Sequence, residues 1–79
     1  MMMQTEALTW VANLFEESAG VLTPDTPRED IPAWDSLGVL TLMAGFDSEF
    51  GITLSDDQLQ KMKKVDDILE VLRTQGALT

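Results

Sequence analysis

Apolar residues recur at helical spacing in three stretches of the chain, and this periodicity limits the possible folds more than any other feature. The clearest stripe is at the C-terminal end, with Val65, Ile68, Leu69 and Leu72 at positions i, i+3, i+4 and i+7. No stretch shows the alternation of a β-strand. A chain of 79 residues is close to the smallest that can build a core, and a helical bundle is its usual solution. The sequence therefore predicts one all-α domain over residues 1–79.

A first helix is expected over residues 5–18, followed by a long connection. The apolar stripe of this helix consists of Leu8, Val11, Ala12, Leu14 and Phe15. Gly20 comes directly after it and is the expected stop, because glycine readily adopts the backbone conformation that ends helices. Three prolines then break any period between residues 21 and 34. The apolar residues expected to pin this loop to the bundle are Val21, Leu22, Ile31 and Trp34.

The second helix opens at Asp35 or Ser36, runs to about Phe50 and ends at Gly51. Its core face is predicted to carry Leu42, Met43, Phe46 and Phe50. A mixed apolar and acidic strip beside Ser36 falls largely off that face. It consists of Leu37, Leu40, Thr41, Ala44, Asp47 and Ser48.

Two further helices complete the expected fold. Ser55 and Gln58 match the S-x-x-Q capping box of a short third helix that ends near Met62. The fourth helix contains the stripe that begins at Val65 and stops at Gly76. The predicted architecture is therefore an antiparallel four-helix bundle, with three long helices, one short third helix and a long loop between the first two.

Charge and missing residue types exclude several classes of function. The formal net charge of −9 would repel nucleic acid and favours basic protein partners. The chain has no histidine and no cysteine, so it lacks the commonest general base, the commonest metal ligand and any thiol nucleophile. We therefore expect neither enzymatic activity nor a metal site. The N-terminus does not resemble a signal peptide and no stretch is apolar enough to span a bilayer, so we expect a cytoplasmic monomer without membrane insertion.

Ser36 is the candidate working residue. It follows Asp35 at the expected start of the second helix, where the helix macrodipole would stabilise an attached phosphate. A serine at a helix start is, on its own, more often an ordinary polar residue of the first turn. The tryptophans Trp10 and Trp34 are likewise expected to serve packing. The position of Ser36 favours a modification site, and the rest of the chain must decide between the two interpretations.

Asp35-Ser36-Leu37 and the sequence after it resemble the acyl carrier protein family, over about residues 8–72. Beyond the Asp-Ser-Leu motif, the resemblance rests on four features of the downstream register. These are Leu42 and Phe46 on the core face, Glu49-Phe50-Gly51-Ile52, the acidic pair Asp56-Asp57, and Val65-x-x-Ile68. The acidity, the length and the long first loop agree with the same family.

The resemblance implies that Ser36 bears a 4′-phosphopantetheine arm, transferred from coenzyme A by a separate Mg²⁺-dependent phosphopantetheinyl transferase. Asp35 and Leu37 would complete the attachment site. The thiol of the arm would carry acyl groups as thioesters, and it would be the only thiol because the chain has no cysteine. Acyl-loading and acyl-processing enzymes with basic docking patches would bind a surface made of Leu37, Gly38, Leu40, Thr41, Ala44, Asp47 and Ser48.

The chain departs from the pattern of fatty-acid carriers around the motif. Gly38 stands where an aspartate is typical, and Thr41 and Ser48 stand where acidic residues are expected. Together with Trp34, these residues favour a carrier of a specialised pathway over one of housekeeping fatty-acid synthesis. Two alternatives remain open: an aminoacyl or peptidyl carrier, and an unmodified acidic interaction module with the same fold.

Overall fold

The four expected helices are present in the computed structural model, which describes residues 2–18 and 20–78. Within these ranges the long loop also contains a short 3-10 turn, η1. The elements are α1 (Gln4–Leu14), η1 (Arg28–Asp30), α2 (Ser36–Phe50), α3 (Asp56–Lys61) and α4 (Val65–Thr74). The prediction of an all-α four-helix bundle with a short third helix is confirmed.

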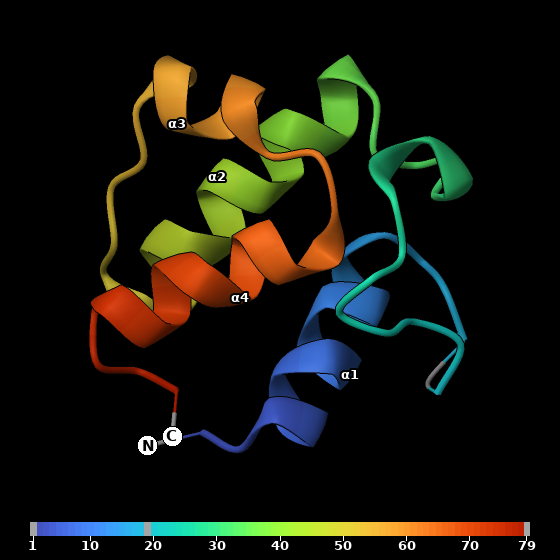
Figure 1. The fold of residues 1–79 in the computed structure, drawn as a ribbon. Helices are drawn as coiled ribbons and strands as arrows, with labels where there is room; N and C mark the ends of the chain where they lie inside the picture. Colours follow the sequence, from blue (N-terminus) through green and yellow to red (C-terminus); the bar gives the residue numbers. More distant parts are fainter. Residues whose placement is uncertain (1, 19, 79) are drawn as a thin grey trace.

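The helices enclose a single core, and the start of α2 lies far from the chain ends. In Figure 1, α2 descends from the upper right toward the left, α4 runs from right to left below it, and the short α3 lies between them in the chain. The α1 helix runs in the opposite sense and packs against both α2 and α4. Both ends of the chain lie at the bottom of these views, opposite the start of α2.

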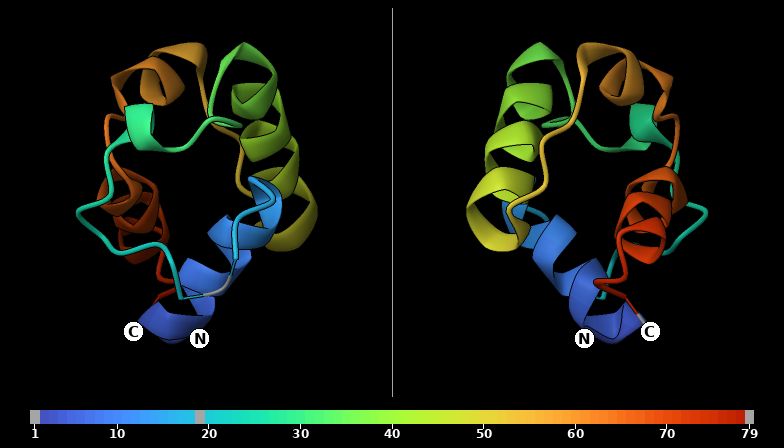
Figure 2. Two further views of the ribbon diagram at one scale, coloured as in Figure 1. Left: turned by 90° about the vertical axis from the view of Figure 1, so that its right-hand side faces the viewer. Right: turned by 90° about the vertical axis from the view of Figure 1, so that its left-hand side faces the viewer.

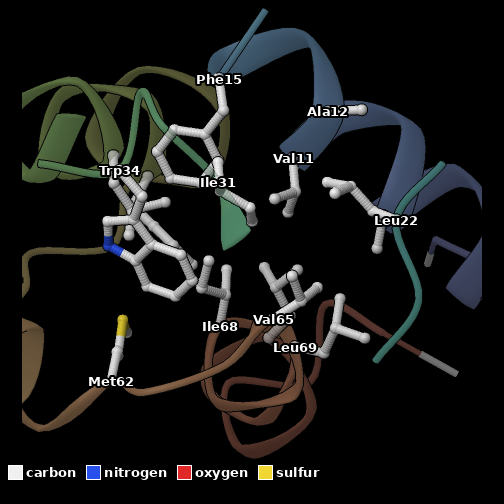
Figure 3. Packing of buried hydrophobic residues seen from close by; sticks show 14 of the residues in the cluster. Val11, Ala12, Phe15, Leu22, Ile31, Trp34, Met62, Val65, Ile68 and Leu69 are labelled. Atoms are coloured by element: carbon white, nitrogen blue, oxygen red, sulfur yellow. The ribbon is translucent and has the colours of Figure 1, made fainter. Parts of the chain in front are cut away.

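The core takes side chains from all four helices and from the loop, as Figure 3 shows for one part of it. The largest fully buried side chains are Phe15, Phe46, Leu42, Leu59, Ile68, Leu69, Leu72, Val11 and Val65. Burying one such side chain stabilises the fold by roughly 1.5–3 kcal/mol. Of the residues expected to pin the loop, Leu22, Ile31 and Trp34 are buried. The prediction for Val21 is wrong, because the turn that brings Leu22 into the core leaves Val21 58% exposed.

The first helix is shorter than predicted. It ends at Leu14 because Glu16 takes the left-handed conformation, with φ 57°. The N–H of Glu17 then donates to the carbonyl oxygen of Ala12 at 2.8 Å, which closes the helix end. Gly20 is therefore not the stop. A left-handed residue other than glycine costs about 1–2 kcal/mol, and the packing of the buried Phe15 offsets this cost.

The ends of α2 and α4 and the start of α3 are formed by the glycines and the capping box that predicted them. Gly51 ends α2 with φ 65° and Gly76 follows α4 with φ 74°. At the start of α3, Ser55 Oγ accepts from Gln58 N at 3.1 Å, and Gln58 Oε1 accepts from Ser55 N at 3.0 Å. The capping box and both glycine stops are confirmed.

The long loop is attached to the junction between α3 and α4. The N–H of Arg28 donates to the carbonyl oxygen of Lys63 at 2.8 Å, and the N–H of Val65 donates to that of Thr26 at 3.0 Å. These backbone bonds place η1 beside the end of α3. The loop therefore arrives at α2 along a defined path.

Candidate functional site

Asp35 caps the start of α2. It has an extended backbone, and its Oδ1 accepts hydrogen bonds from the N–H groups of Leu37 and Gly38, both at 3.0 Å. The carbonyl oxygen of Asp35 accepts the N–H of Val39 at 2.9 Å, which begins the helical pattern. An aspartate in this position satisfies amide groups that have no partner inside the helix. The start of α2 is therefore defined by one carboxylate.

Ser36 is the first residue of α2, and its side chain is exposed. Its hydroxyl has no hydrogen-bond partner among the described residues. The first turn of α2 contains no acidic residue, so the capping carboxylate of Asp35 is the one side-chain charge in the cap and first turn that offsets the positive end of the helix dipole. An anionic group attached to this oxygen would be favoured electrostatically.

Trp34 anchors the chain immediately before the cap. Its N–H donates to the carbonyl oxygen of Ile31 at 3.0 Å, and its own carbonyl oxygen accepts from Arg28 Nε at 3.2 Å. The indole is buried and stacks on Phe15, with ring centroids 5.3 Å apart and an interplanar angle of 17°. The Arg28 guanidinium lies 5.5 Å from the centroid of the indole. The backbone that presents Ser36 is thus held from both sides, which confirms the packing role predicted for Trp34.

Gly38 lies at the edge of the predicted docking surface, and its contact with partners stays a prediction. It is buried, and a Cβ at this position would overlap the carbonyl oxygen of Ala33 and lie 2.9 Å from its carbonyl carbon. The loop passes this close because Asp35 turns the chain directly into the helix. Glycine at position 38 therefore allows the loop and α2 to meet.

The other predicted docking residues share one exposed strip of α2. They are Leu37, Leu40, Thr41, Ala44, Asp47 and Ser48. Leu37 is 72% exposed and Leu40 is 59% exposed, which is unusual for large apolar side chains of a small domain. Asp47 is the only carboxylate of the strip. The structure therefore brings these six residues together on a surface that is more apolar than acidic.

Two surface hollows adjoin the strip and include residues that the sequence did not indicate. One, of about 320 Å³, lies beside the helix start and includes Leu14, Glu16 and Ala33 along with Asp35, Leu37, Gly38 and Thr41. The other, of about 350 Å³, is lined by Leu40, Met43, Ala44, Asp47 and Thr53. Met43 was assigned to the core, but it is only partly buried. The left-handed turn at Glu16 places the end of α1 beside this surface. Because no sequence signal marks that turn, the contribution of α1 could not be predicted.

In the part of the chain that the structure describes, no helix has the length and apolar character needed to cross a bilayer.

Comparisons with known proteins identify relatives over most of the chain. No family model matches it. The acyl carrier protein of Thermobifida fusca is 30% identical over 74 residues, which cover 89% of this chain and 94% of that protein. The acyl carrier protein of Rickettsia canadensis is 30% identical over 71 residues, covering 89% and 81% respectively.

A solved structure gives the same result for the fold. The solution structure of holo acyl carrier protein from Geobacter metallireducens matches with a TM-score of 0.73 and 30% sequence identity. The match covers 89% of this chain and 80% of that one. Sequence and fold agree over nearly the same share of the chain, and the chain therefore belongs to the acyl carrier protein family.

Proposed function

We propose that this acyl carrier bears its cargo on a 4′-phosphopantetheine arm attached to Ser36. The observation that supports this site best is the exposed, unpartnered hydroxyl of Ser36 at the N-terminus of α2. A phosphodiester there would lie at the positive end of the helix dipole. The similar protein of known structure from Geobacter metallireducens is described as the holo form, which agrees with a prosthetic group in this family.

Attachment needs little from this chain beyond a positioned hydroxyl. Ser36 Oγ would attack the β-phosphorus of coenzyme A, forming a new P–O bond as adenosine 3′,5′-bisphosphate leaves and the proton passes to a base of the transferase. Asp35 holds the first turn in place, and Leu37 lies exposed next to the serine for contact with the transferase. The bound arm supplies a thiol that forms thioesters, which the chain lacks because it has no cysteine.

We further propose that the carrier serves a specialised pathway. The exposed strip of α2 offers Leu37, Leu40 and Thr41 near the serine and a single carboxylate, Asp47, farther along. Acyl-loading and acyl-processing enzymes would therefore contact mainly apolar side chains near Ser36, with one charged contact at Asp47 farther along the helix. Partners selected in this way would differ from enzymes that bind a strongly acidic helix.

Incubation with coenzyme A and a broad-specificity phosphopantetheinyl transferase tests the attachment site. Intact mass spectrometry should show the phosphopantetheine adduct on the wild-type protein and on Ser48→Ala, a control that removes another exposed serine of α2. Ser36→Ala should show none. An adduct on Ser36→Ala, or its absence from the wild type, would overturn the proposal. The mass of protein isolated from its native host would identify the acyl or aminoacyl cargo.

A further inference from the structure

The indole N–H of Trp34 is a buried donor without an acceptor. Among the described residues it is the one buried side-chain nitrogen or oxygen that lacks a hydrogen-bond partner. The side chain is only 3% exposed, so solvent does not reach the N–H in this conformation. Buried polar groups are nearly always paired, and each exception requires an explanation. An indole N–H can donate but cannot accept, so its missing partner must be an acceptor.

Met62 lies near this N–H and also lines a hollow in the protein surface. Figure 3 shows the Met62 side chain beneath the nitrogen edge of the indole, with its sulfur toward the ring. Met62 is itself 3% exposed, yet it forms part of the wall of a surface hollow of about 380 Å³. Methionine is unbranched and flexible, so it can change rotamer without moving the backbone. Its displacement would open the hollow toward Trp34.

The hollow is lined mainly by hydrogen-bond donors. Its other walls are Arg28, Glu29, Gln60 and Lys63. Arg28 also holds Trp34 in place, through its Nε–H bond to the backbone and its position over the ring. Two cations and an amide face one carboxylate, so the site favours a ligand that offers oxygen acceptors. An entirely hydrocarbon ligand would leave the Trp34 N–H unsatisfied.

We propose that this hollow binds an acyl group that carries a carbonyl or hydroxyl oxygen, and that the oxygen accepts a hydrogen bond from Trp34 Nε1. Met62 moves aside when the acyl group enters. This inference rests on the carrier function proposed above, because the acyl group is delivered from Ser36, which follows Trp34 by two positions. The site would discriminate oxygenated acyl chains from saturated ones of the same length.

The two indole N–H signals in the nuclear magnetic resonance spectrum of ¹⁵N-labelled protein provide the test. The chain has two tryptophans, so Trp10 is an internal control in every spectrum. Ser36 is loaded with a saturated acyl arm or with the β-oxo arm of equal length, and loading is verified by intact mass. With the β-oxo arm, the Trp34 signal should move downfield, and its exchange with solvent should slow roughly fivefold or more relative to the saturated arm. The Trp10 signal should not differ between the two.

Equal Trp34 shifts and exchange rates for the two arms would overturn the proposal. Trp34→Phe keeps an aromatic ring and removes the N–H, so in this variant the backbone signals of Met62 and Lys63 should no longer distinguish the two arms. The wild-type measurement stands without this variant if it does not fold. Failure of Ser36 to load would be visible in the mass spectrum beforehand, and it would remove the carrier function together with this inference.

Discussion

The start of α2 and its end are held by different kinds of contact. At the start, the Asp35 carboxylate accepts two backbone N–H groups, and Gly38 lies directly against the backbone of Ala33. At the end, Gly51 takes a left-handed conformation, and only backbone groups close the helix: the N–H groups of Gly51 and Ile52 donate to carbonyl oxygens of the last turn. The start of α2 therefore depends on the Asp35 carboxylate and on the absence of a side chain at Gly38, whereas its end depends on the backbone conformation of Gly51.

The aromatic packing at the end of α2 is correspondingly more tolerant. Trp10 meets Phe46 and Phe50 edge to face, with ring centroids 5.3 Å and 5.0 Å apart. Such contacts depend on shape and can relax by small rotations of the rings. The contrast between the two ends indicates that the geometrically specific contacts of α2 are concentrated at its start, where Ser36 is positioned. Substitutions at the two ends should therefore differ in their effect on stability.

The largest effect is expected for Gly38→Ala. Its new Cβ would overlap the carbonyl oxygen of Ala33, a backbone atom that cannot move without displacing the loop. We expect a loss of about 3 kcal/mol in the free energy of unfolding, measured by urea denaturation. A loss below about 1 kcal/mol would show that the loop before α2 gives way easily, contrary to the comparison.

Asp35→Ala should follow, because it removes the acceptor for Leu37 N and Gly38 N. The expected loss is about 1–2 kcal/mol in the same measurement. Asp35→Asn is the matched control, since its amide oxygen still accepts these bonds and the negative charge is removed. If Asp35 also positions the transferase or its metal, Asp35→Asn should stay stable but accept phosphopantetheine more slowly. Wild-type stability of Asp35→Ala would contradict the capping role.

Glu16→Gly should stabilise the protein by about 1 kcal/mol, because Glu16 occupies a left-handed conformation that glycine adopts without strain. Gly51→Ala is its mirror experiment at the end of α2 and should cost a similar amount. Thermal unfolding of both variants provides the measurement. Changes of the same sign would show that packing, not backbone conformation, dominates at one of these positions.

The smallest effect is expected for Gly45→Ala. A Cβ there would lie 3.1 Å from Leu14 Cδ2 and 3.2 Å from Trp10 Cζ2, both at the ends of side chains. Alanine is favoured over glycine in a helix interior by about 1 kcal/mol, which offsets the crowding. The free energy of unfolding should therefore stay within about 1 kcal/mol of wild type. A loss as large as that of Gly38→Ala would remove the distinction between the two ends.

Features that depend on neighbouring residues could be predicted from the sequence. The stripe that begins at Val65, the capping box at Ser55 and the stop at Gly51 each have a local physical cause. The helix start at Asp35 and Ser36 was predicted for the same reason. The attachment of phosphopantetheine to Ser36 stays a prediction, because the fold positions the hydroxyl without testing its modification.

Features that depend on distant residues could not be predicted. Nothing near Glu16 marks it as left-handed, since the early end of α1 goes with the stacking of Phe15 on Trp34, far along the chain. The family resemblance included Gly38 in the docking surface, but it cannot show that the loop backbone crosses there.

The position of the chain ends has a consequence for building larger proteins from this carrier. The N–H of Met2 donates to the carbonyl oxygen of Ala77 at 2.9 Å, and a bridge joins Met2 to Leu78. The two ends therefore leave the molecule side by side, at the pole opposite the start of α2 (Figures 1 and 2). A neighbouring domain, an affinity tag or a tandem copy fused at either end would stand clear of Ser36. A short linker between the ends would also allow circular permutation with that face left open.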